Sequence, residues 1–204
     1  MKQKKSELPR KPRVPRHASP QSHEVRIIGG QWKRTKLAVA DRPSLRPTPD
    51  RVRETLFNWL GQDLSGWRCI DAFAGTGALG FEAASRGAKE VTLVEQDSTL
   101  VAQLKRVQTQ LQASATQIVR GDGIAALKQL DPASMDVVFV DPPFDSVLFE
   151  AAVQAAGRAV AKDGFVYLEA PTLWTDAQLE SAGLKLHRHL KAGAVHAHLL
   201  TRLG

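Results

Sequence analysis

Four consecutive residues, Asp141-Pro142-Pro143-Phe144, carry the strongest chemical signal in the sequence. They follow the apolar run at 137–140, which is typical of a strand buried on both faces of a parallel sheet. Asp141 and the Pro142 carbonyl can accept hydrogen bonds from the two N–H groups of a base's exocyclic amine and so aim its lone pair at a methyl donor. The prolines stiffen the loop, and Phe144 offers a stacking face for an extruded base. We interpret these four residues as catalytic; the alternative is a rigid turn that only ends the strand.

A second motif lies upstream, where residues 71–80 read Asp-Ala-Phe-Ala-Gly-Thr-Gly-Ala-Leu-Gly. Its G-x-G-x-x-G pattern by itself also fits dinucleotide binding. Asp71 favours a methionine-derived cofactor, because a carboxylate there would repel pyrophosphate but can hold an amino group. Glu95 and Asp122 end the next two predicted strands, where they can bind ribose hydroxyls and an adenine amine, or alternatively only cap helices. The predicted S-adenosylmethionine site comprises Asp71, Phe73, Ala74, Gly75, Gly77, Glu95, Gln96, Asp122 and Gly123.

Strands and helices that could position these motifs alternate from residue 68 onward. The candidate strands are 68–73, 90–95, 116–120, 136–141, 164–169, 184–190 and 195–202. The candidate helices are 78–87, 98–112, 123–130, 146–161 and 175–182. Because no helix separates the last two strands, we expect them to pair antiparallel through a turn at Ala192-Gly193. The pattern predicts an α/β, doubly wound, seven-stranded and mostly parallel sheet with a terminal antiparallel hairpin.

The positive charge of the chain is concentrated near its N-terminus. Residues 1–60 hold 15 Lys and Arg against 5 Asp and Glu, whereas residues 61–204 hold 13 against 16. Residues 1–24 carry four prolines and few apolar side chains, so we expect a disordered tail there. A polyanionic partner would account for the charge, because Lys and Arg beside phosphates release condensed counterions. A solvated tail is the simpler alternative for part of it.

Residues 25–61 are expected to form a β-hairpin and a helix that precede the catalytic domain at 62–204. The hairpin is predicted to turn at Gly29-Gly30. Thr48 is expected to cap the helix, which Gly61 closes. A basic ribbon with an aromatic side chain is typical of a nucleic-acid surface, although an ordinary solvated face is the alternative. The hairpin residues predicted to contact RNA are Arg26, Trp32, Lys33, Arg34 and Lys36.

The composition excludes several classes of protein. No apolar run approaches the roughly 20 residues that span a bilayer, and no apolar segment follows the basic start, so we expect neither a membrane anchor nor a secretory signal. Cys69, the single cysteine, cannot form an internal disulfide and is expected to be a buried structural thiol. These features indicate a soluble cytoplasmic protein.

Four histidines near the C-terminus form a candidate metal cluster. With a turn at Ala192-Gly193, His187 would face His198 and His189 would face His196, all on one face of the hairpin. Four such imidazoles could bind zinc. We favour a polar outer face opposite the apolar side chains of the same strands, and predict no metal.

With these motifs in place, the chain resembles the small-subunit ribosomal RNA guanine-N2 methyltransferases of the RsmD type. The likeness covers about residues 25–204 and is carried by the segments 26–30, 45–48, 50–60, 71–80 and 138–144. It implies a Rossmann-like class I methyltransferase fold and transfer of a methyl group from S-adenosylmethionine to the 2-amino group of one guanosine in 16S rRNA. We expect the substrate to be rRNA in a small-subunit assembly particle, and the enzyme to be a monomer.

The same resemblance assigns roles to residues outside the two motifs. It implies that Thr48, Arg51 and Phe57 line the cofactor pocket and that Arg46 joins the hairpin in holding RNA. Two features depart from the family: the basic, proline-rich tail, and an acidic start, Asp145-Ser146, to the segment after the catalytic motif.

Three other functions are open. An amino-group methyltransferase acting on adenine in DNA or on a protein glutamine usually has Asn at the position of Asp141. An NAD-dependent oxidoreductase would leave residues 141–144 unexplained. A non-catalytic RNA-binding module would have no use for the acids at Asp71, Glu95 and Asp122.

Overall fold

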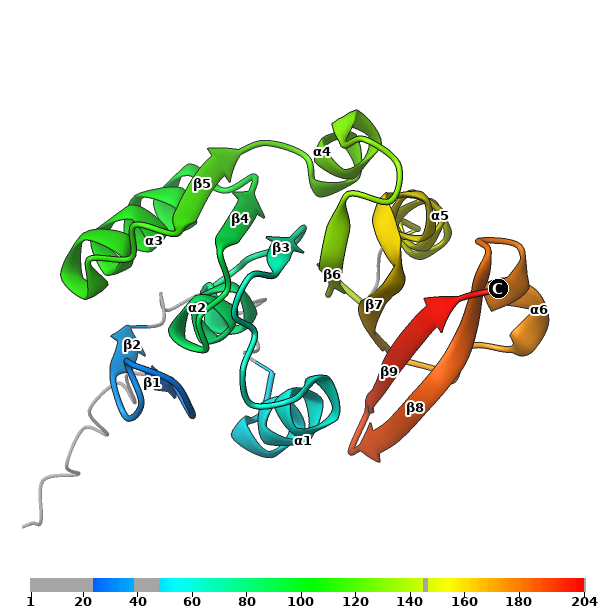
Figure 1. Cartoon of the computed structure of the whole chain (residues 1–204), viewed down its shortest axis with the longest axis horizontal. Coiled ribbons are helices and arrows are strands. Elements are labelled where there is room, and N and C mark those ends of the chain that lie inside the picture. Colours follow the sequence, from blue (N-terminus) through cyan, green and yellow to red (C-terminus); the bar gives the residue numbers. More distant parts are fainter. Residues whose placement is uncertain (1–23, 39–47, 145–146, 204) are drawn as a thin grey trace, which may run out of the picture.

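Strands alternate with helices through most of the chain (Figure 1). The computed structural model describes residues 24–38, 48–144 and 147–203. In chain order the elements are β1 (Glu24–Arg26), β2 (Lys36–Ala38), α1 (Asp50–Leu60), β3 (Arg68–Asp71), α2 (Ala78–Ser85), β4 (Glu90–Glu95), α3 (Ser98–Leu111), β5 (Thr116–Arg120), α4 (Gly123–Gln129), β6 (Met135–Val140), α5 (Phe149–Ala159), β7 (Val160–Ala170), α6 (Asp176–Glu180), β8 (Leu184–Ala192) and β9 (Val195–Arg202).

A seven-stranded sheet in the order β5-β4-β3-β6-β7-β9-β8 forms the centre of the structure. Strands β3 to β7 run parallel, whereas β9 pairs antiparallel with both β7 and β8. The chain leaves β3 toward β4 on one side and β6 toward β7 on the other, so the strand order reverses between β3 and β6. Ligands of open α/β sheets bind beyond the carboxyl ends of the strands at such a point. The predicted doubly wound sheet with its terminal hairpin is confirmed.

Side chains of the central strands pack into two separate hydrophobic cores, one on each face of the sheet. In β6, Val137 and Phe139 point to the face covered by α1, α2 and α3, whereas Val138 and Val140 point to the face covered by α4, α5 and α6. All four are fully buried, which explains why this strand reads as a continuous apolar run. Each such side chain contributes about 1.5–3 kcal/mol of burial free energy, so the strand ends are held rigidly.

Several predicted boundaries need correction. Helix α5 spans Phe149–Ala159 instead of 146–161, and β7 begins at Val160, four residues before the predicted strand. The N-cap position of α1 is Pro49, without a side-chain capping bond, so the prediction that Thr48 caps this helix was wrong. The tail expected at 1–24 lies outside the described residues except for Glu24, which begins β1. Arg46, Asp145 and Ser146 also lie outside them.

The N-terminal hairpin does not turn at Gly29-Gly30. Strands β1 and β2 pair Arg26 with Lys36, which leaves residues 27–35 as a longer connection. Gly30 has a φ of 71°, and a Cβ there would lie 1.8 Å from the carbonyl oxygen of Ser85 in α2. The glycines therefore allow the connection to pack directly on α2.

The C-terminal hairpin turns one residue later than predicted, at Gly193-Ala194, and contains a bulge between Leu186 and Arg188. His189 consequently faces His198 instead of His196. The predicted cross-strand pairing of the histidines was wrong.

The structure bears on the expected buried cysteine and on the expected lack of a membrane anchor. Cys69 is buried in β3, as predicted, and its burial raises the pKa of the thiol. Within residues 24–38, 48–144 and 147–203, no helix combines the length and apolar character needed to cross a bilayer.

Candidate active site

Acidic side chains lie at the carboxyl ends of three adjacent strands. Asp71 is the last residue of β3, Asp141 follows β6 directly, and Glu169 is the penultimate residue of β7. The register pairs Val140 with Leu168, which places Asp141 beside Glu169. The strand order thus brings together three carboxyl groups that are far apart in the sequence.

Asp71 is almost completely buried yet only partly satisfied by hydrogen bonds. Its Oδ2 accepts a hydrogen bond from the Gly80 backbone N–H at 3.0 Å, whereas Oδ1 is buried without a partner among the described residues. Burial, together with the nearby Glu95 and Glu169 charges, raises the pKa of Asp71 to about 7, although the backbone N–H groups of Gly80 and Phe73 act in the opposite direction. A buried acceptor without a donor is costly, so Asp71 is suited to receive one from a bound ligand.

The glycine-rich loop after β3 is held against the end of β4. Glu95 Oε2 accepts a hydrogen bond from the Gly75 N–H at 2.9 Å, and Oε1 accepts one from the Asp97 N–H at 2.8 Å. Gly77 adopts a φ of 78°, and a Cβ there would lie 2.6 Å from side-chain atoms of Leu104 and Phe81. The loop follows a path that other residues could not take. Phe73 is half-buried and Ala74 buried beside it.

Asp122 lies at the N-terminus of α4, beyond the end of β5. Its Oδ1 accepts a hydrogen bond from the Ala125 N–H at 2.7 Å, so it caps the helix, and its Oδ2 accepts one from Gln96 Nε2 at 2.9 Å. Gly123 is needed for close approach, because a Cβ there would lie 2.0 Å from the Ala72 carbonyl oxygen. The helix-capping role is confirmed; binding of an adenine amine by Asp122 stays a prediction.

The corner formed by residues 141–144 is buried at its start and exposed at its end. Asp141 is half-buried, Pro142 is buried, and Pro143 and Phe144 are exposed. Burial and the charges of Glu169 and Asp71 raise the pKa of Asp141 well above its usual range. Three like charges in one buried place disfavour full ionisation, so a cationic ligand would be stabilised there.

Glu169 was missed in the sequence, although it ends an apolar strand just as Asp71 and Glu95 do. Its Oε1 accepts a 2.8 Å hydrogen bond from the Tyr167 hydroxyl, and it also accepts one from the side chain of Thr48. Burial raises its pKa, and these hydrogen bonds and Arg53 partly counteract the effect. Glu169 therefore joins the segment before α1 to the acidic strand ends.

The three residues in and just before α1 to which the resemblance assigns a cofactor role occupy different environments. Thr48 is buried beside Glu169, and Arg51 is exposed. Phe57 is fully buried, with its ring centroid 6.2 Å from that of Phe139 and the Arg86 guanidinium carbon 4.7 Å from it. Phe57 thus belongs to the core beneath β6.

A buried ion cluster, here called the Glu82 cluster (Arg53, Glu82 and Arg86), attaches the N-terminal hairpin and α1 to α2. Glu82 accepts hydrogen bonds from the backbone N–H groups of Ile28 and Gly29, both at 2.7 Å, and pairs with Arg86 at 2.8 Å. The fully buried Arg53 lies 3.8 Å from Glu82 and donates to the Arg26 carbonyl at 2.9 Å. Sequence patterns gave no sign of this cluster, because its partners come from three separate segments.

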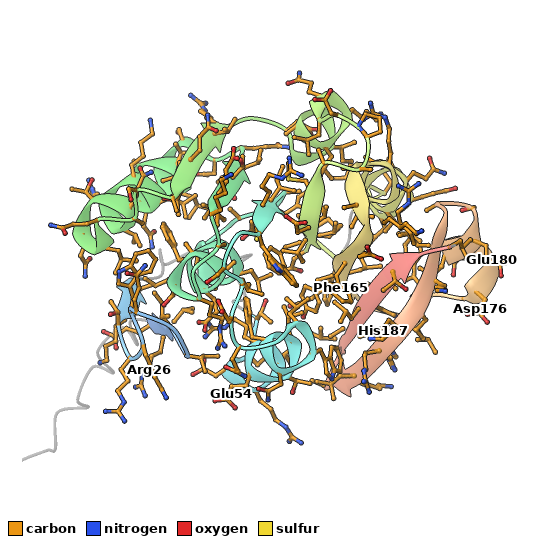
Figure 2. The ribbon with its side chains drawn as sticks, viewed as in Figure 1. Arg26, Glu54, Phe165, Asp176, Glu180 and His187 are labelled. Atoms are coloured by element: carbon orange, nitrogen blue, oxygen red, sulfur yellow. The ribbon has the colours of Figure 1, made fainter. Side chains whose placement is uncertain are left out.

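The basic side chains of the hairpin lie on the surface. Arg26, which points into solvent in Figure 2, is exposed, as are Lys33 and Arg34. Lys36 is exposed and pairs with Glu24 at 2.6 Å. Trp32 is half-buried and packs against the core, so much of its ring area is already used.

Three of the four C-terminal histidines lie together. The ring of His189 is 5.2 Å from that of His196 and 5.1 Å from that of His198, whereas His187 packs on Phe165. His198 is fully buried, with Nδ1 3.2 Å from the Leu168 carbonyl and Nε2 accepting from the Trp174 N–H at 3.2 Å. In the part of the chain that the structure describes, no group of three or more His, Cys, Asp or Glu is arranged to hold a metal ion.

Comparison with known proteins identifies similar sequences over nearly the whole chain. A family model described as conserved hypothetical protein 95 matches residues 25–201. The ribosomal RNA small subunit methyltransferase D of Escherichia coli (strain K12) is 40% identical over 194 residues, covering 92% of this chain and 94% of the relative. The protein of the same name from Haemophilus influenzae is 40% identical over 178 residues, covering 81% of this chain and 92% of the relative.

A solved structure shares both sequence and fold with the chain. It is a putative methyltransferase from Escherichia coli, 39% identical, with a TM-score of 0.74 over 88% of this chain and 98% of that one. The fold is that of the class I methyltransferases, as predicted.

Proposed function

This chain belongs to the RsmD family, whose model covers residues 25–201, and on that premise we propose that it transfers a methyl group from S-adenosylmethionine to the 2-amino group of a guanosine in 16S rRNA. The names of its relatives support rRNA of the small subunit as the substrate. They favour this reading over an NAD-dependent oxidoreductase, a DNA or protein methyltransferase, and a non-catalytic RNA-binding module.

The observation that carries the proposal is the gathering of acidic side chains at the ends of β3, β6 and β7. The Glu169 charge raises the pKa of both Asp71 and Asp141, and the Asp71 charge also raises that of Asp141. Asp71 Oδ1 is a buried acceptor without a hydrogen-bond partner among the described residues. S-adenosylmethionine supplies an electrophilic methyl group on a positively charged sulfonium and also carries an ammonium group. Its positive charge and its ammonium N–H groups therefore fit this set of acidic acceptors.

The remaining predicted contacts would hold the rest of the cofactor. Asp71 would accept from the ammonium group, Glu95 from ribose hydroxyls and Asp122 from the adenine amine. Phe73, Ala74, Gly75, Gly77, Gln96 and Gly123 would surround these contacts. Thr48 would contribute to the cofactor site through its hydrogen bond with Glu169, and Arg51 would approach the cofactor from the exposed start of α1. Phe57 would act only indirectly, because it packs on Phe139 of β6 within the core.

The catalytic corner would orient the acceptor amine. Asp141 and the Pro142 carbonyl would each accept one N–H, which frees the nitrogen lone pair from the ring. Phe144, exposed at the tip, would stack on the extruded guanine. Correct placement of two reactants can lower a barrier by about 7–11 kcal/mol. S-adenosylmethionine would supply the methyl group, and Asp141 would be suited to accept the proton that the methylated nitrogen loses, because its pKa is raised.

The basic hairpin would bind the RNA backbone. Arg26, Lys33 and Arg34 are free of ion pairs with the described residues and exposed, whereas Lys36 already pairs with Glu24. Trp32 would contribute through its exposed edge, and Arg46 from the connection before α1. We expect one protein molecule to act on rRNA within a small-subunit assembly particle in the cytoplasm.

Substrate comparison tests the proposal directly. Methyl-labelled cofactor is incubated with the protein and either naked 16S rRNA, small-subunit particles lacking the modification, duplex DNA or a glutamine-containing protein. Label is expected in rRNA or particles, and nucleoside mass spectrometry is expected to find N2-methylguanosine. Label in DNA or protein, or on another nucleoside, would overturn the proposed function.

A further inference from the structure

A small pocket lies beside the catalytic corner, between the start of α5 and α6. It has a volume of about 310 Å³ and is lined by Val147, Phe149, Glu150, Trp174, Gln178 and Ser181. This volume is at the small end of the range for ligand sites. The pocket adjoins the corner because the ring centroids of Phe144 and Phe149 are 6.5 Å apart. A group bound here would be a neighbour of whatever stacks on Phe144.

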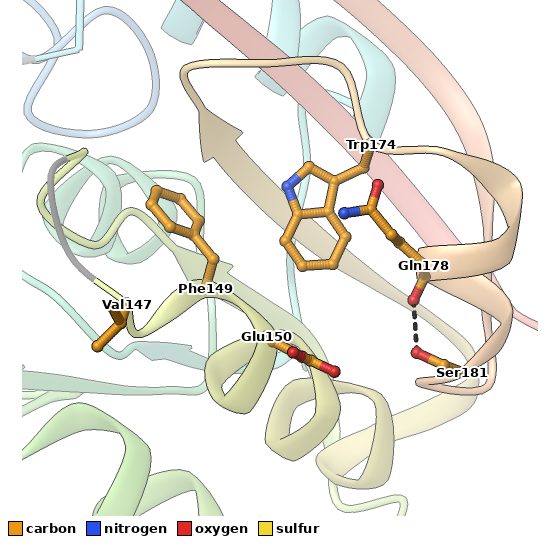
Figure 3. A pocket seen from close by; sticks show the side chains of 6 residues that line it. All are labelled: Val147, Phe149, Glu150, Trp174, Gln178 and Ser181. Atoms are coloured by element: carbon orange, nitrogen blue, oxygen red, sulfur yellow. Dashed lines mark hydrogen bonds between the residues drawn. The ribbon is translucent and has the colours of Figure 1, made fainter.

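Two aromatic rings form the walls of this pocket. Phe149 and Trp174 face each other across the view, with Glu150 below the space between them and the Gln178 amide on the far side of the Trp174 ring (Figure 3). One lining side chain, Val147, is 97% exposed, and Leu173, which precedes Trp174 in the sequence, is 50% exposed. Exposed apolar groups gathered around a concave site indicate a surface that is covered during function.

Trp174 is held in place by a buried histidine. The backbone N–H of Trp174 donates to His198 Nε2 at 3.2 Å, and His198 Nδ1 lies 3.2 Å from the Leu168 carbonyl of β7. Both ring nitrogens are therefore engaged in one defined tautomer. Because β7 also carries Glu169, the aromatic wall is attached to the same strand as the acidic site.

The polar groups of the pocket determine what it can bind. Glu150 is exposed and acidic, which disfavours a phosphate and favours an N–H donor such as a base amine. Gln178 Oε1 already accepts from the Thr175 N–H and hydroxyl, both at 2.9 Å. That leaves the amide nitrogen of Gln178, which faces the Trp174 ring in Figure 3, as its remaining donor. Aromatic walls with one acceptor and one donor match the ring and edge of a nucleobase.

We infer that this pocket binds the base of the nucleotide adjacent in the RNA chain to the methylated guanosine. The inference rests on the proposed function, since it requires that the target guanine stack at Phe144. The geometry favours a flanking base as the occupant. A nucleotide that is covalently joined to the extruded guanosine must lie next to it, and the pocket lies next to Phe144, where the guanine would stack. The pocket would then help select the RNA by its contact with a neighbouring base.

Variants of the pocket test this inference when combined with altered RNA. Phe149→Ala removes one wall, and Leu186→Ala is the matched control, because Leu186 is 37% exposed on β8 and does not line the pocket. With intact RNA, Phe149→Ala is expected to raise KM for RNA by about 5- to 150-fold, the range given by one lost base–aromatic stack. Cofactor affinity should stay unchanged, and Leu186→Ala should match the parent protein.

The decisive measurement uses RNA in which the nucleotide on the 5′ or 3′ side of the mapped target is abasic. For the parent protein, one of these two RNAs should raise KM by a similar factor. With that RNA, Phe149→Ala should cause little further increase, because the stack is already missing. Glu150→Gln, an exposed substitution that keeps the fold, should show the same pattern with a smaller factor.

Two results would overturn the inference. If the effects of Phe149→Ala and the abasic nucleotide multiply, or if Phe149→Ala and Glu150→Gln both match Leu186→Ala, the pocket does not bind that base while rRNA methylation stands. If the parent protein methylates neither rRNA nor particles, the inference falls together with the proposed function.

Discussion

Two groups of charged side chains lie near Arg53 of α1, and they are built in opposite ways. In the Glu82 cluster, one carboxylate lies between two arginines and also accepts two backbone N–H groups. At the strand ends, Asp71, Asp141 and Glu169 share the same sign, and the pKa of each is raised. Arg53 belongs to the first group and acts on Glu169 in the second.

The difference separates a structural cluster from a functional one. A buried charge surrounded by partners stabilises a particular packing, and removing one partner is costly. Buried charges of like sign destabilise the unliganded protein and are expected where a ligand of opposite sign binds. The first cluster should therefore determine folding and the second should determine ligand binding and catalysis.

Loss of an acidic side chain at the strand ends should have the largest effect on catalysis. Asp141→Asn keeps the size of the side chain but removes its charge and proton-accepting ability. We expect methyl transfer to fall by at least about 10³-fold, because both orientation of the amine and stabilisation of developing charge are impaired. Label incorporation into rRNA measures the rate, and titration with cofactor should give nearly the parent affinity. A variant that retains most of its activity would remove Asp141 from the mechanism.

Glu82→Gln tests the other half of the comparison. It leaves the buried Arg86 without its carboxylate partner and leaves Arg53 with only that of the exposed Asp50, so the free energy of unfolding should fall by about 3–5 kcal/mol. Denaturant unfolding measures the change, and Glu54→Gln on the exposed side of α1 is the control. Activity per folded molecule should be largely retained; a stable but inactive Glu82→Gln variant would contradict the division of roles.

The raised pKa of Asp71 should make the stability of the protein depend on pH. Asp71 has a pKa of about 7 in the folded protein against 3.8 ordinarily, so between these values the folded state holds a proton that the unfolded state has lost. The free energy of unfolding therefore falls as pH rises from about 4 to about 7 and levels off above that. Asp71→Asn should remove a decline of at most about 4 kcal/mol. Chemical denaturation at several pH values measures it, and equal slopes for both proteins would show that Asp71 ionises freely.

The sheet was predictable because its strands carry the signal themselves. Strands β4, β5 and β9 match their predicted ranges, and each contains two adjacent apolar residues near its end that are followed by a polar or charged residue. The acids at Asp71, Glu95 and Asp141 followed from the rule that ligands bind at the carboxyl ends of parallel strands. Glu169 obeys the same rule and could have been found by applying it to β7.

The corrections arose where distant residues decide local structure. Gly29 and Gly30 look like a hairpin turn, but their partners Glu82 and Ser85 lie in α2. The histidine pairing was shifted by a bulge at residues 186–188 and by the position of the turn, neither of which alters the alternation of residue types. Thr48 has the side chain of a helix cap, yet it bonds to Glu169 instead. Local patterns do not contain these partners.

The attachment of the hairpin also affects the order of events during translation. Ile28 and Gly29 are made 54 and 53 residues before Glu82, and at about 5–20 residues per second this corresponds to a delay of about 3–10 s. Through that interval the apolar side chains of Val25, Ile27 and Leu37 have no α2 to pack against. The nascent segment is then a natural client for a chaperone that binds short apolar stretches near the ribosome.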